Sequence, residues 1–543
     1  MERLFPQNED FAENLVRSIV QLPKALWMVL GVLGLAGLGA GIIVQPELVV
    51  FALVGIGIGI PAALFAWNRP EFILVAVVFL SSGFISANKM EVGGGLELRD
   101  VALIGSLGLL VFQGIIRKEL KIIWWPVAAP LIVFLLIAIV SLFNALMFEN
   151  VALNWAFNDM RILIYYAMFF STGWAIKNEK QLMIVWLGLF LIADLIAVII
   201  FIQQPLGASN PLLESMVGGR WDLIDQGVAV RVVPAAHALM HFMAVIAFVF
   251  IVYAQHIKWL FWFGIFQFGF LNVSLLLTFT RSQWLATAIA LFLIGIYIFP
   301  QYKALIFRWA VKYSVPTILI LIFLFGVFGT TISKALEEIP IVGGVVDRFA
   351  TIFTPSETLE TNSLEWREFE FQQGFAALRE SPWLGVSLGN SYRQVTTLQG
   401  EVLGWWTDGN LERGYISRFT RFIHSSYLAI AVKMGIPGFI AFMWFCLAFI
   451  WESWRLARRM PDSLNKGFVL AIFTAFIGLM QWSVFHTHFM RTESTIAVGI
   501  MTGIVASINH LHEKSSRTQG SNSNGNNDTQ AHRNVLGEQP LSS

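Results

Sequence analysis

A histidine at the start of an apolar run is the first candidate for chemistry in this sequence. His424 follows a basic stretch that includes Arg418 and Arg421, and it precedes Ser425 and Ser426, which can cap a helix. An imidazole titrates near neutral pH, so it can take a proton from a hydroxyl group or shield a developing charge. A single histidine at such a boundary is more often a structural polar contact. The neighbouring arginines favour a functional role here.

Two further arginines stand at the ends of apolar runs. Arg231 lies just before the run that starts near residue 235, and Arg281 lies in a short turn between two runs. A guanidinium in that position is costly to desolvate unless it is paired or faces water. Each arginine alone can instead extend to lipid headgroups. Two arginines facing one cavity would suit an anion, because the planar fork binds phosphate oxygens with parallel hydrogen bonds.

The composition defines the broad class of the chain. Of 543 residues, 56% are hydrophobic and 13% are charged, whereas soluble domains carry roughly 25% charged residues. The chain is therefore a polytopic membrane protein. The formal net charge of +1 indicates no partner, and the single cysteine, Cys446, excludes an intrachain disulfide. No cleavable signal peptide is evident, because the first apolar run is too long and no cleavage site follows it.

The apolar runs predict fourteen transmembrane helices, since about 18 residues cross the hydrocarbon layer. We predict an all-α polytopic membrane protein with about 12–14 transmembrane helices and one large, partly helical exterior loop. The expected spans lie at about 26–44, 48–66, 71–87, 100–116, 126–147, 161–176, 181–203, 235–254, 258–278, 282–299, 310–329, 426–450, 467–487 and 493–509.

Every second connection between the apolar runs carries lysine or arginine, and this pattern sets the expected orientation. Cytoplasmic connections are enriched in these residues, and the basic connections here all fall on one side together with both termini. We therefore expect a cytoplasmic N-terminus at 1–25, transmembrane helices 1–11 at 26–329, and a large exterior loop at 330–425. Transmembrane helices 12–14 follow at 426–510. The polar composition of 511–543 predicts a disordered cytoplasmic tail.

Two long exterior connections, at about 204–234 and 330–425, are the places where chemistry is expected. The larger one contains a helix-like stretch from Trp366 to Arg379 that includes Arg367, and Pro382 and Gly385 end it. Exposed aromatic residues of this loop can stack on sugar rings, although loop aromatics are as often packed beneath the loop. These aromatics are Trp383, Tyr392, Trp405 and Trp406.

Two alternatives remain open from the residues alone. Histidines 237, 241, 486 and 488, together with His424, would form a zinc site if they converged, although their spacing does not require it. Asp194, inside an apolar run, is the kind of acid that couples ions in a transporter such as a flippase for lipid-linked glycans. The structural alternative is that Asp194 is a buried partner for a hydroxyl or backbone group. The absence of an internal repeat and the size of the exterior loop favour an enzyme.

Four stretches together resemble a known family. Ile423-His-Ser-Ser-Tyr-Leu428 followed by Gly435-Ile-Pro-Gly438 is similar to the C-terminal signature of the O-antigen ligase/polymerase superfamily. The segments 231–241, 277–285 and 366–389 resemble its arginine-led helix, its Ser-Arg-x-x-Trp segment and its helix with Pro-x-x-Gly. The resemblance covers roughly residues 200–450. This chain departs from the family where Ser425 replaces the usual asparagine, and where Ser282 replaces the usual glycine.

The resemblance implies a glycan transferase of the bacterial inner membrane whose site faces the periplasm. The donor would be a glycan on undecaprenyl diphosphate and the acceptor a hydroxyl of a glycan or lipid, without nucleotide, metal or other cofactor, and without nucleic acid. The expected catalytic residues are His424, Arg281 and Arg231, and the expected diphosphate or glycan contacts are Arg367, Arg421, Arg418 and Trp383. Ligase, polymerase and protein oligosaccharyltransferase are not separated, and ligase is the default.

Overall fold

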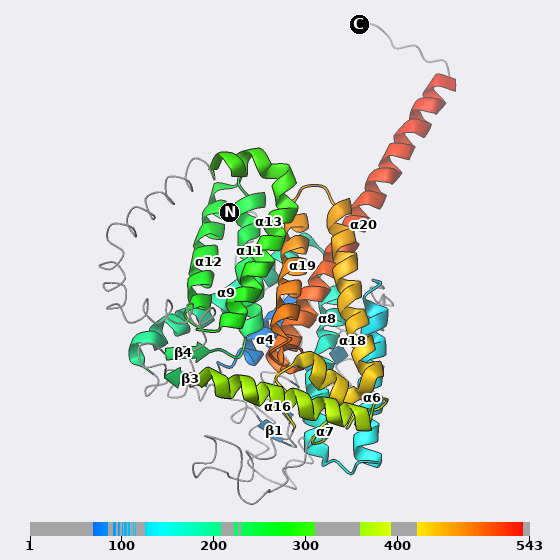
Figure 1. Ribbon diagram of the computed structural model, residues 1–543. Coiled ribbons are helices and arrows are strands. Elements are labelled where there is room, and N and C mark those ends of the chain that lie inside the picture. The colour runs from blue at the N-terminus through cyan, green and yellow to red at the C-terminus, as the bar shows by residue number, and fades with distance from the viewer. Residues whose placement is uncertain are drawn as a thin grey trace, which may run out of the picture.

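The computed structural model is a helical bundle (Figure 1). It describes residues 69–84, 125–207, 230–309, 359–392 and 421–535, with 91–93, 96–97, 222–225 and a few positions between 100 and 115. Among these residues, seven helices are long and apolar enough to cross a bilayer, and two apolar helices are shorter. The predicted fold class, an all-α polytopic membrane protein, is confirmed.

Most described helices coincide with expected spans, because apolar length sets both. They are α4 (Glu71–Ser81), α6 (Ala128–Met147), α9 (Glu179–Leu206), α11 (His237–Tyr253), α12 (Lys258–Leu276), α13 (Arg281–Trp309), α18 (Ser426–Arg459), α19 (Leu464–Trp482) and α20 (Thr492–Val535). The expected spans 26–44, 48–66 and 310–329, and most of 100–116, lie outside the described residues.

The expected span 161–176 is wrong in detail. The structure has α7 (Leu153–Ile164), a short 3-10 helix η2 (Tyr165–Ala167) and α8 (Met168–Ala175). The hydroxyl of Tyr165 donates to Asp100, and that of Tyr166 donates to the carbonyl of Phe489 at 3.0 Å. Hydropathy alone misses the start of α7, because its first turns carry polar residues such as Asp159.

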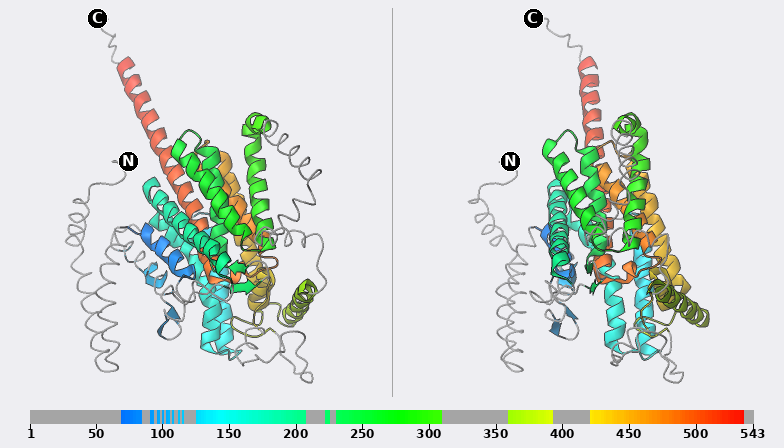
Figure 2. Two further views of the ribbon diagram at one scale, coloured as in Figure 1. Left: turned by 90° about the vertical axis from the view of Figure 1, so that its left-hand side faces the viewer. Right: turned by 60° about the vertical axis from the view of Figure 1, so that its left-hand side comes forward.

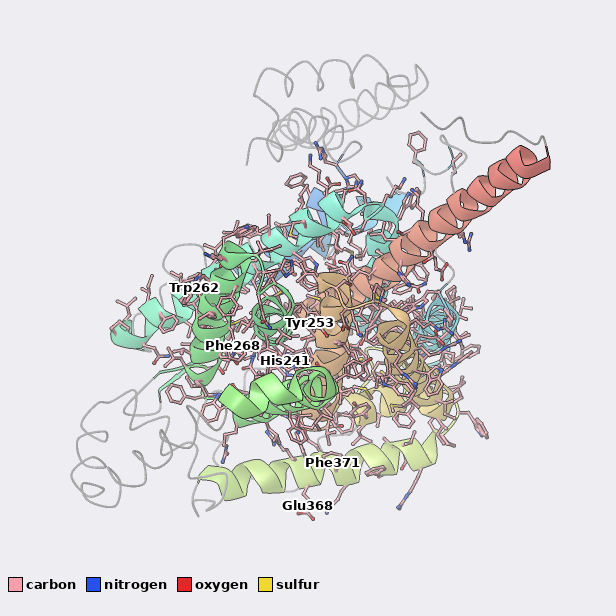
Figure 3. The ribbon with its side chains drawn as sticks, turned by 90° about the horizontal axis from the view of Figure 1, so that it is seen from above. His241, Tyr253, Trp262, Phe268, Glu368 and Phe371 are labelled. Atoms are coloured by element: carbon pink, nitrogen blue, oxygen red, sulfur yellow. The ribbon has the colours of Figure 1, made fainter. Side chains whose placement is uncertain are left out.

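Helices α19 and α20 form the centre of the bundle. The apolar windows of α20 and α19 are 83% and 67% buried, against 33% for α6, α12 and α13. Accordingly, α19 packs against α11, α13 and α18, whereas α20 packs against α8. The less buried helices present apolar side chains outward, as Trp262 of α12 does in the view along the bundle (Figure 3).

One end of the bundle collects the expected exterior connections, and we call it the site end. It carries the antiparallel hairpin β3 (Asp222–Asp225) and β4 (Val230–Val233), together with the starts of α11, α13 and α18. Helix α16 (Leu359–Glu380) lies across this end (Figure 1). A second short hairpin is formed by β1 (Glu91–Gly93) and β2 (Leu96–Glu97).

The expected cytoplasmic connections lie together at the opposite end, which we call the basic end. There the start of α19 meets the start of α9, since Asn465 donates to Glu179 at 3.4 Å. Gly467 of α19 packs against Tyr253 at the end of α11. The connections at this end carry a group of basic residues: Lys177, Lys180, Lys258, Arg455, Arg458, Arg459 and Lys466.

Helix α20 is longer than expected. It continues to Val535 and leaves the bundle at the end opposite α16 (Figure 2), whereas the sequence predicts a disordered tail from residue 511. An existing helix extends at low cost, because each added residue gains one hydrogen bond. Pairs one turn apart also support it: Asn509 donates to Glu513 at 3.0 Å, and Arg517 lies 3.9 Å from Glu513.

Helix α18 is interrupted at Gly435 to receive the turn that follows α16. Gly435 has φ 70° and ψ −178°, a conformation open essentially only to glycine. A Cβ at this position would lie 2.3 Å from the carbonyl oxygen of Trp383. The Ile436 amide donates to the Pro382 carbonyl, and the Val386 amide to the Val432 carbonyl, both at 2.8 Å. The turn and the interruption therefore interlock.

Candidate functional site

His424 lies at the site end and is held by Glu370 of α16. Both the backbone amide and the ring Nδ1 of His424 hydrogen-bond to one oxygen, Glu370 Oε2, at 3.1 and 2.8 Å. The carboxylate is buried, with 3% of its side chain exposed, whereas the His424 side chain is 36% exposed. One edge of the imidazole is thus fixed by the protein while the ring remains accessible.

The sequence of α16 explains how Glu370 reaches this position. Among the side chains of α16 that the structure describes, the buried ones are Glu370, Gly374 and Ala377, at spacings of four and three, so they share one face of the helix. A Cβ on Gly374 would lie 2.8 Å from a methyl group of Leu428, so glycine permits close approach to α18. The opposite face is solvated, and Glu368 points away from the bundle (Figure 3).

Two serines after His424 fix the start of α18. Ser425 is the N-cap residue, and its hydroxyl accepts from the Leu428 amide at 3.5 Å, as the sequence predicts. The Ser426 hydroxyl donates to the His486 carbonyl at 2.9 Å and accepts from the Phe489 amide at 3.1 Å. The beginning of α18 is therefore tied to the connection between α19 and α20.

That connection joins His424 to the start of α13. The His486 ring Nε2 is 2.9 Å from the Ser282 hydroxyl, which follows Arg281 in the first turn of α13. Burial lowers the pKa of His486 well below its usual value, and Arg367, His424, Arg231 and Arg491 lower it further. Three arginines, Arg231, Arg367 and Arg491, therefore lie near His486.

The arginines also act on one another. The pKa of Arg367 is lowered, first by burial and then by Arg281, although Glu370 opposes the shift. Arg231, on β4, is partly buried and acts on the same His486 as Arg367 does. Because like charges raise each other's free energy, such a group suits a site that receives an anion.

The structure thus brings together four of the seven predicted site residues, which are His424, Arg281, Arg231 and Arg367. Arg421 instead stacks its guanidinium on Trp155 of α7, with 4.0 Å between the guanidinium carbon and the ring centroid.

The other two predicted contacts and the loop aromatics have different environments. Trp383 lies in the turn after α16 and is 72% exposed. Tyr392 is buried in a small apolar cluster with Ile423 and Leu428, so its ring packs beneath the loop. Arg418, Trp405 and Trp406 lie outside the described residues.

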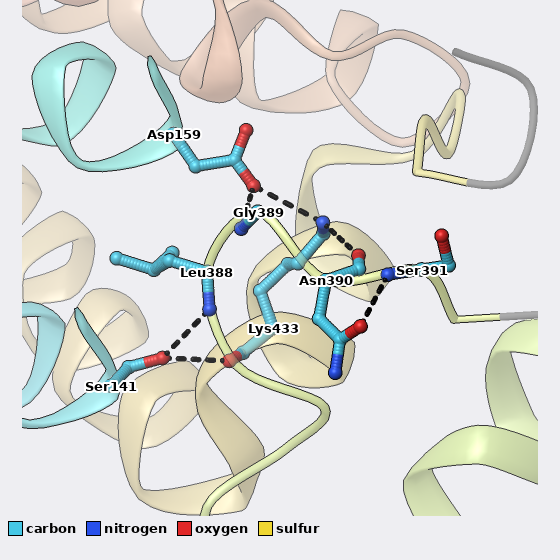
Figure 4. A network of polar contacts seen from close by, with 7 residues as sticks. All are labelled: Ser141, Asp159, Leu388, Gly389, Asn390, Ser391 and Lys433. Carbon is cyan, nitrogen blue, oxygen red and sulfur yellow. Dashed lines mark hydrogen bonds and ion pairs between the residues drawn. The ribbon is translucent and has the colours of Figure 1, made fainter. Parts of the chain in front are cut away.

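A buried ion pair supports the turn on which Trp383 lies (Figure 4). Lys433 Nζ lies 3.1 Å from Asp159 of α7 and donates to the Asn390 carbonyl at 2.7 Å. The same Asp159 oxygen accepts from the Gly389 amide at 2.7 Å. Ser141 of α6 bridges the Leu388 amide and the Lys433 carbonyl. Helices α6, α7 and α18 are therefore joined through residues 387–391.

The other four histidines of the zinc hypothesis gather around the indole of Trp482. The rings of His488, His237, His486 and His241 lie 3.8, 5.6, 6.1 and 6.3 Å from it, centroid to centroid. Among the described residues, no three His, Cys, Asp or Glu side chains form a group that could hold a metal ion. Asp194 accepts a hydrogen bond from Gln267 of α12 at 2.8 Å, which gives it a polar partner.

Sequence reasoning missed Glu370, Arg491 and the Ser282–His486 pair. A carboxylate at helical spacing from two small residues, Gly374 and Ala377, was the available signal for Glu370. Arg491 stands between two expected spans, as Arg281 does, so the same reasoning would have found it.

The fold and the site together define a multi-pass helical membrane protein with a cationic site at one end. Residues 266–443, about a third of the chain, match a family model described as O-antigen ligase. This match confirms the resemblance found in the motifs and supports membership of the O-antigen ligase superfamily. It includes Arg281, Arg367 and His424, whereas Arg231 precedes it. A search of curated proteins finds no match. The family supports a ligase or polymerase type of function.

Proposed function

We propose that the protein transfers an oligosaccharide or polysaccharide from undecaprenyl diphosphate to an acceptor hydroxyl, as a ligase that acts on lipid A–core or a similar acceptor. The observation that carries this proposal is the convergence of Arg231, Arg281, Arg367 and the partly exposed His424 on the region around His486. The family match supports the glycan chemistry, and the arginines support a diphosphate as the charged part of the donor.

The proposed transfer reaction uses the positive charge of the arginines. The acceptor oxygen attacks the anomeric carbon, the bond from that carbon to the phosphate oxygen breaks, and the diphosphate leaves with the electron pair. Arg231 and Arg281 stabilise the negative charge that develops on the leaving group, and Arg367 adds a further contact. His424 takes the proton of the acceptor hydroxyl. Positive side chains thus supply the charge that a metal ion supplies in other enzymes, and the proposed reaction needs none.

The remaining predicted contacts suit the sugar part of the substrate. Arg421 on Trp155 and the exposed Trp383 present flat surfaces away from the arginine group, and such surfaces stack on sugar rings. The basic end fits the cytoplasmic side of a bacterial inner membrane, which turns the site end toward the periplasm. A polymerase of the same superfamily would share the donor and the arginines, so it differs from a ligase in its acceptor.

The test uses cells from which the gene has been deleted, complemented with wild type or with His424→Ala, Arg281→Ala or Arg231→Ala. We expect wild type to restore glycan transfer and each variant to abolish it at equal protein level in the membrane. Arg455→Ala is the matched control, because this exposed arginine pairs with Glu452 within α18, near its basic end. Near-normal transfer by all three site variants would remove the proposed site.

The glycan pattern separates the two activities. In a ligase deletion, full-length glycan stays on the lipid carrier and lipid A–core remains bare. In a polymerase deletion, single repeats appear on lipid A–core, or a secreted polymer is lost while single repeats remain on the carrier. Unchanged transfer by His424→Ala would instead favour transport or a site elsewhere.

A further inference from the structure

Glu370 accepts two hydrogen bonds from His424, and this geometry determines which ring nitrogen of His424 can take a proton. Its Oε2 accepts from the His424 backbone amide at 3.1 Å and is 2.8 Å from the ring Nδ1. A carboxylate only accepts hydrogen bonds, so the proton of the neutral imidazole lies on Nδ1. The lone pair is then on Nε2, at the other edge of the ring.

We infer that Glu370 is a positioning residue that makes Nε2 of His424 the proton acceptor of the transfer reaction. This inference rests on the proposed function, in which His424 deprotonates the acceptor hydroxyl. The proton moves from the hydroxyl to Nε2, while the oxygen electron pair forms the bond to the anomeric carbon and the diphosphate departs. Glu370 remains a carboxylate throughout and stabilises the positive imidazolium that forms.

The burial of Glu370 argues against a merely structural contact. Its side chain is 3% exposed on the face of α16 that packs on Leu428, where an apolar residue would avoid the cost of desolvating a charge. Arg367 lies one turn earlier on the same helix, and the two charges favour each other. The hydrogen bond to Nδ1 places this charge where the imidazolium forms.

The primary test compares Glu370→Ala and Glu370→Gln with wild type in purified, membrane-reconstituted full-length protein. The donor is lipid-linked glycan extracted from the deletion cells, and the acceptor is lipid A–core from the same cells. We expect Glu370→Ala to lower kcat about 10² to 10⁴-fold with little change in KM, because the donor contacts remain. Glu370→Gln keeps the volume but can present either its oxygen or its amide hydrogen to Nδ1, so we expect a smaller loss of kcat.

Glu368→Gln is the matched control. Glu368 lies on the exposed face of the same helix and accepts from Gln372 at 3.3 Å, so its neutralisation leaves His424 untouched. We expect wild-type kcat and KM. Thermal unfolding midpoints of all variants are compared, and Glu370→Gln carries the comparison if Glu370→Ala does not fold.

A double-substitution cycle separates failure of this inference from failure of the proposed function; it is measured with the reconstituted protein, on the residual rate that remains when transfer in cells is no longer seen. If Glu370 acts through His424, Glu370→Ala costs nothing further in a His424→Ala background. An equal fold-loss in both backgrounds, or wild-type kcat for both Glu370 variants, would overturn the inference while leaving His424 in place. Wild-type activity of His424→Ala alone would overturn the proposed function and the inference with it.

Discussion

Replacing Gly435 by alanine tests whether the interlocked turn holds the site together. Two independent effects oppose the substitution. The backbone has φ 70° and ψ −178°, where a residue with a side chain costs about 1 to 3 kcal/mol. The new Cβ would also lie 2.3 Å from the Trp383 carbonyl oxygen and 2.9 Å from that of Pro382, and neither backbone atom can move away as a side chain end can.

The clash also removes the hydrogen bonds that join the turn to α18. The bonds Ile436 to Pro382 and Val386 to Val432 are 2.8 Å long, and each contributes about 1 kcal/mol. With the backbone strain, the docked turn loses about 3 to 5 kcal/mol, which corresponds to roughly a 10² to 5 × 10³-fold rise in the undocked fraction. Because α16 ends in this turn, Glu370 loses its alignment with His424, so we expect glycan transfer to fall strongly.

Hydrogen exchange measured by mass spectrometry reports the docking directly. We expect peptides that contain Val386 and Ile436 to exchange about 10² to 5 × 10³-fold faster in Gly435→Ala, while peptides of α19 remain as in wild type. Gly295→Ala is the control, because a Cβ there meets nothing within 4 Å. Wild-type exchange and wild-type transfer by Gly435→Ala would refute the reasoning.

Two further predictions concern buried charge. Lys433→Met removes the ion-pair partner of Asp159, and we expect a loss of about 3 kcal/mol of stability, the low end of the range because the Asp159 side chain is 25% exposed and Arg421 also acts on it. Lys433→Met with Asp159→Asn should recover part of the thermal midpoint. A double variant as unstable as the two single losses combined would contradict this. Burial and nearby positive groups lower the pKa of His486 and His488 well below the unfolded value of about 6.5, so stability is retained above that pH and is lost as pH falls below it. We expect the free energy of unfolding to fall between about pH 6.5 and 5, by up to about 1.4 kcal/mol per pH unit for each histidine, and the thermal midpoint to fall with it. The fall should be smaller in His488→Gln, and equal pH dependence in that variant would contradict the assignment.

The sequence predicts the helices well because apolar length is a local property. It fails where side chains from distant segments decide the backbone. The 3-10 helix at Tyr165 is held by Asp100 and Phe489, and neither contact is visible in the local composition. The extension of α20 past residue 511 has a different cause: propagation of a formed helix and pairs one turn apart offset its polar composition.

The candidate site also contains residues that the sequence predicts and residues that it does not. Arg231, Arg281 and His424 are recognisable because a charged group at the end of an apolar run is costly and therefore rare. The role of Glu370 depends on how α16 is rotated against α18, which no local pattern fixes. Arg421 shows the converse. It lies three residues before His424 in the sequence, yet its side chain stacks on Trp155 of α7 rather than joining the arginine group.

The rotation of α16 is fixed because two of the attachments between its segment and that of α18 have matched spacing. Glu370 binds His424, and Pro382 binds the amide of Ile436. Each pair of positions, 370 with 382 and 424 with 436, is separated by twelve residues, or about 18 Å of mostly helical chain. A helix rises about 1.5 Å and turns about 100° per residue, so neither stretch can change in length without losing one attachment. The distance from the histidine to the glycine interruption is therefore a condition for placing the carboxylate on the ring.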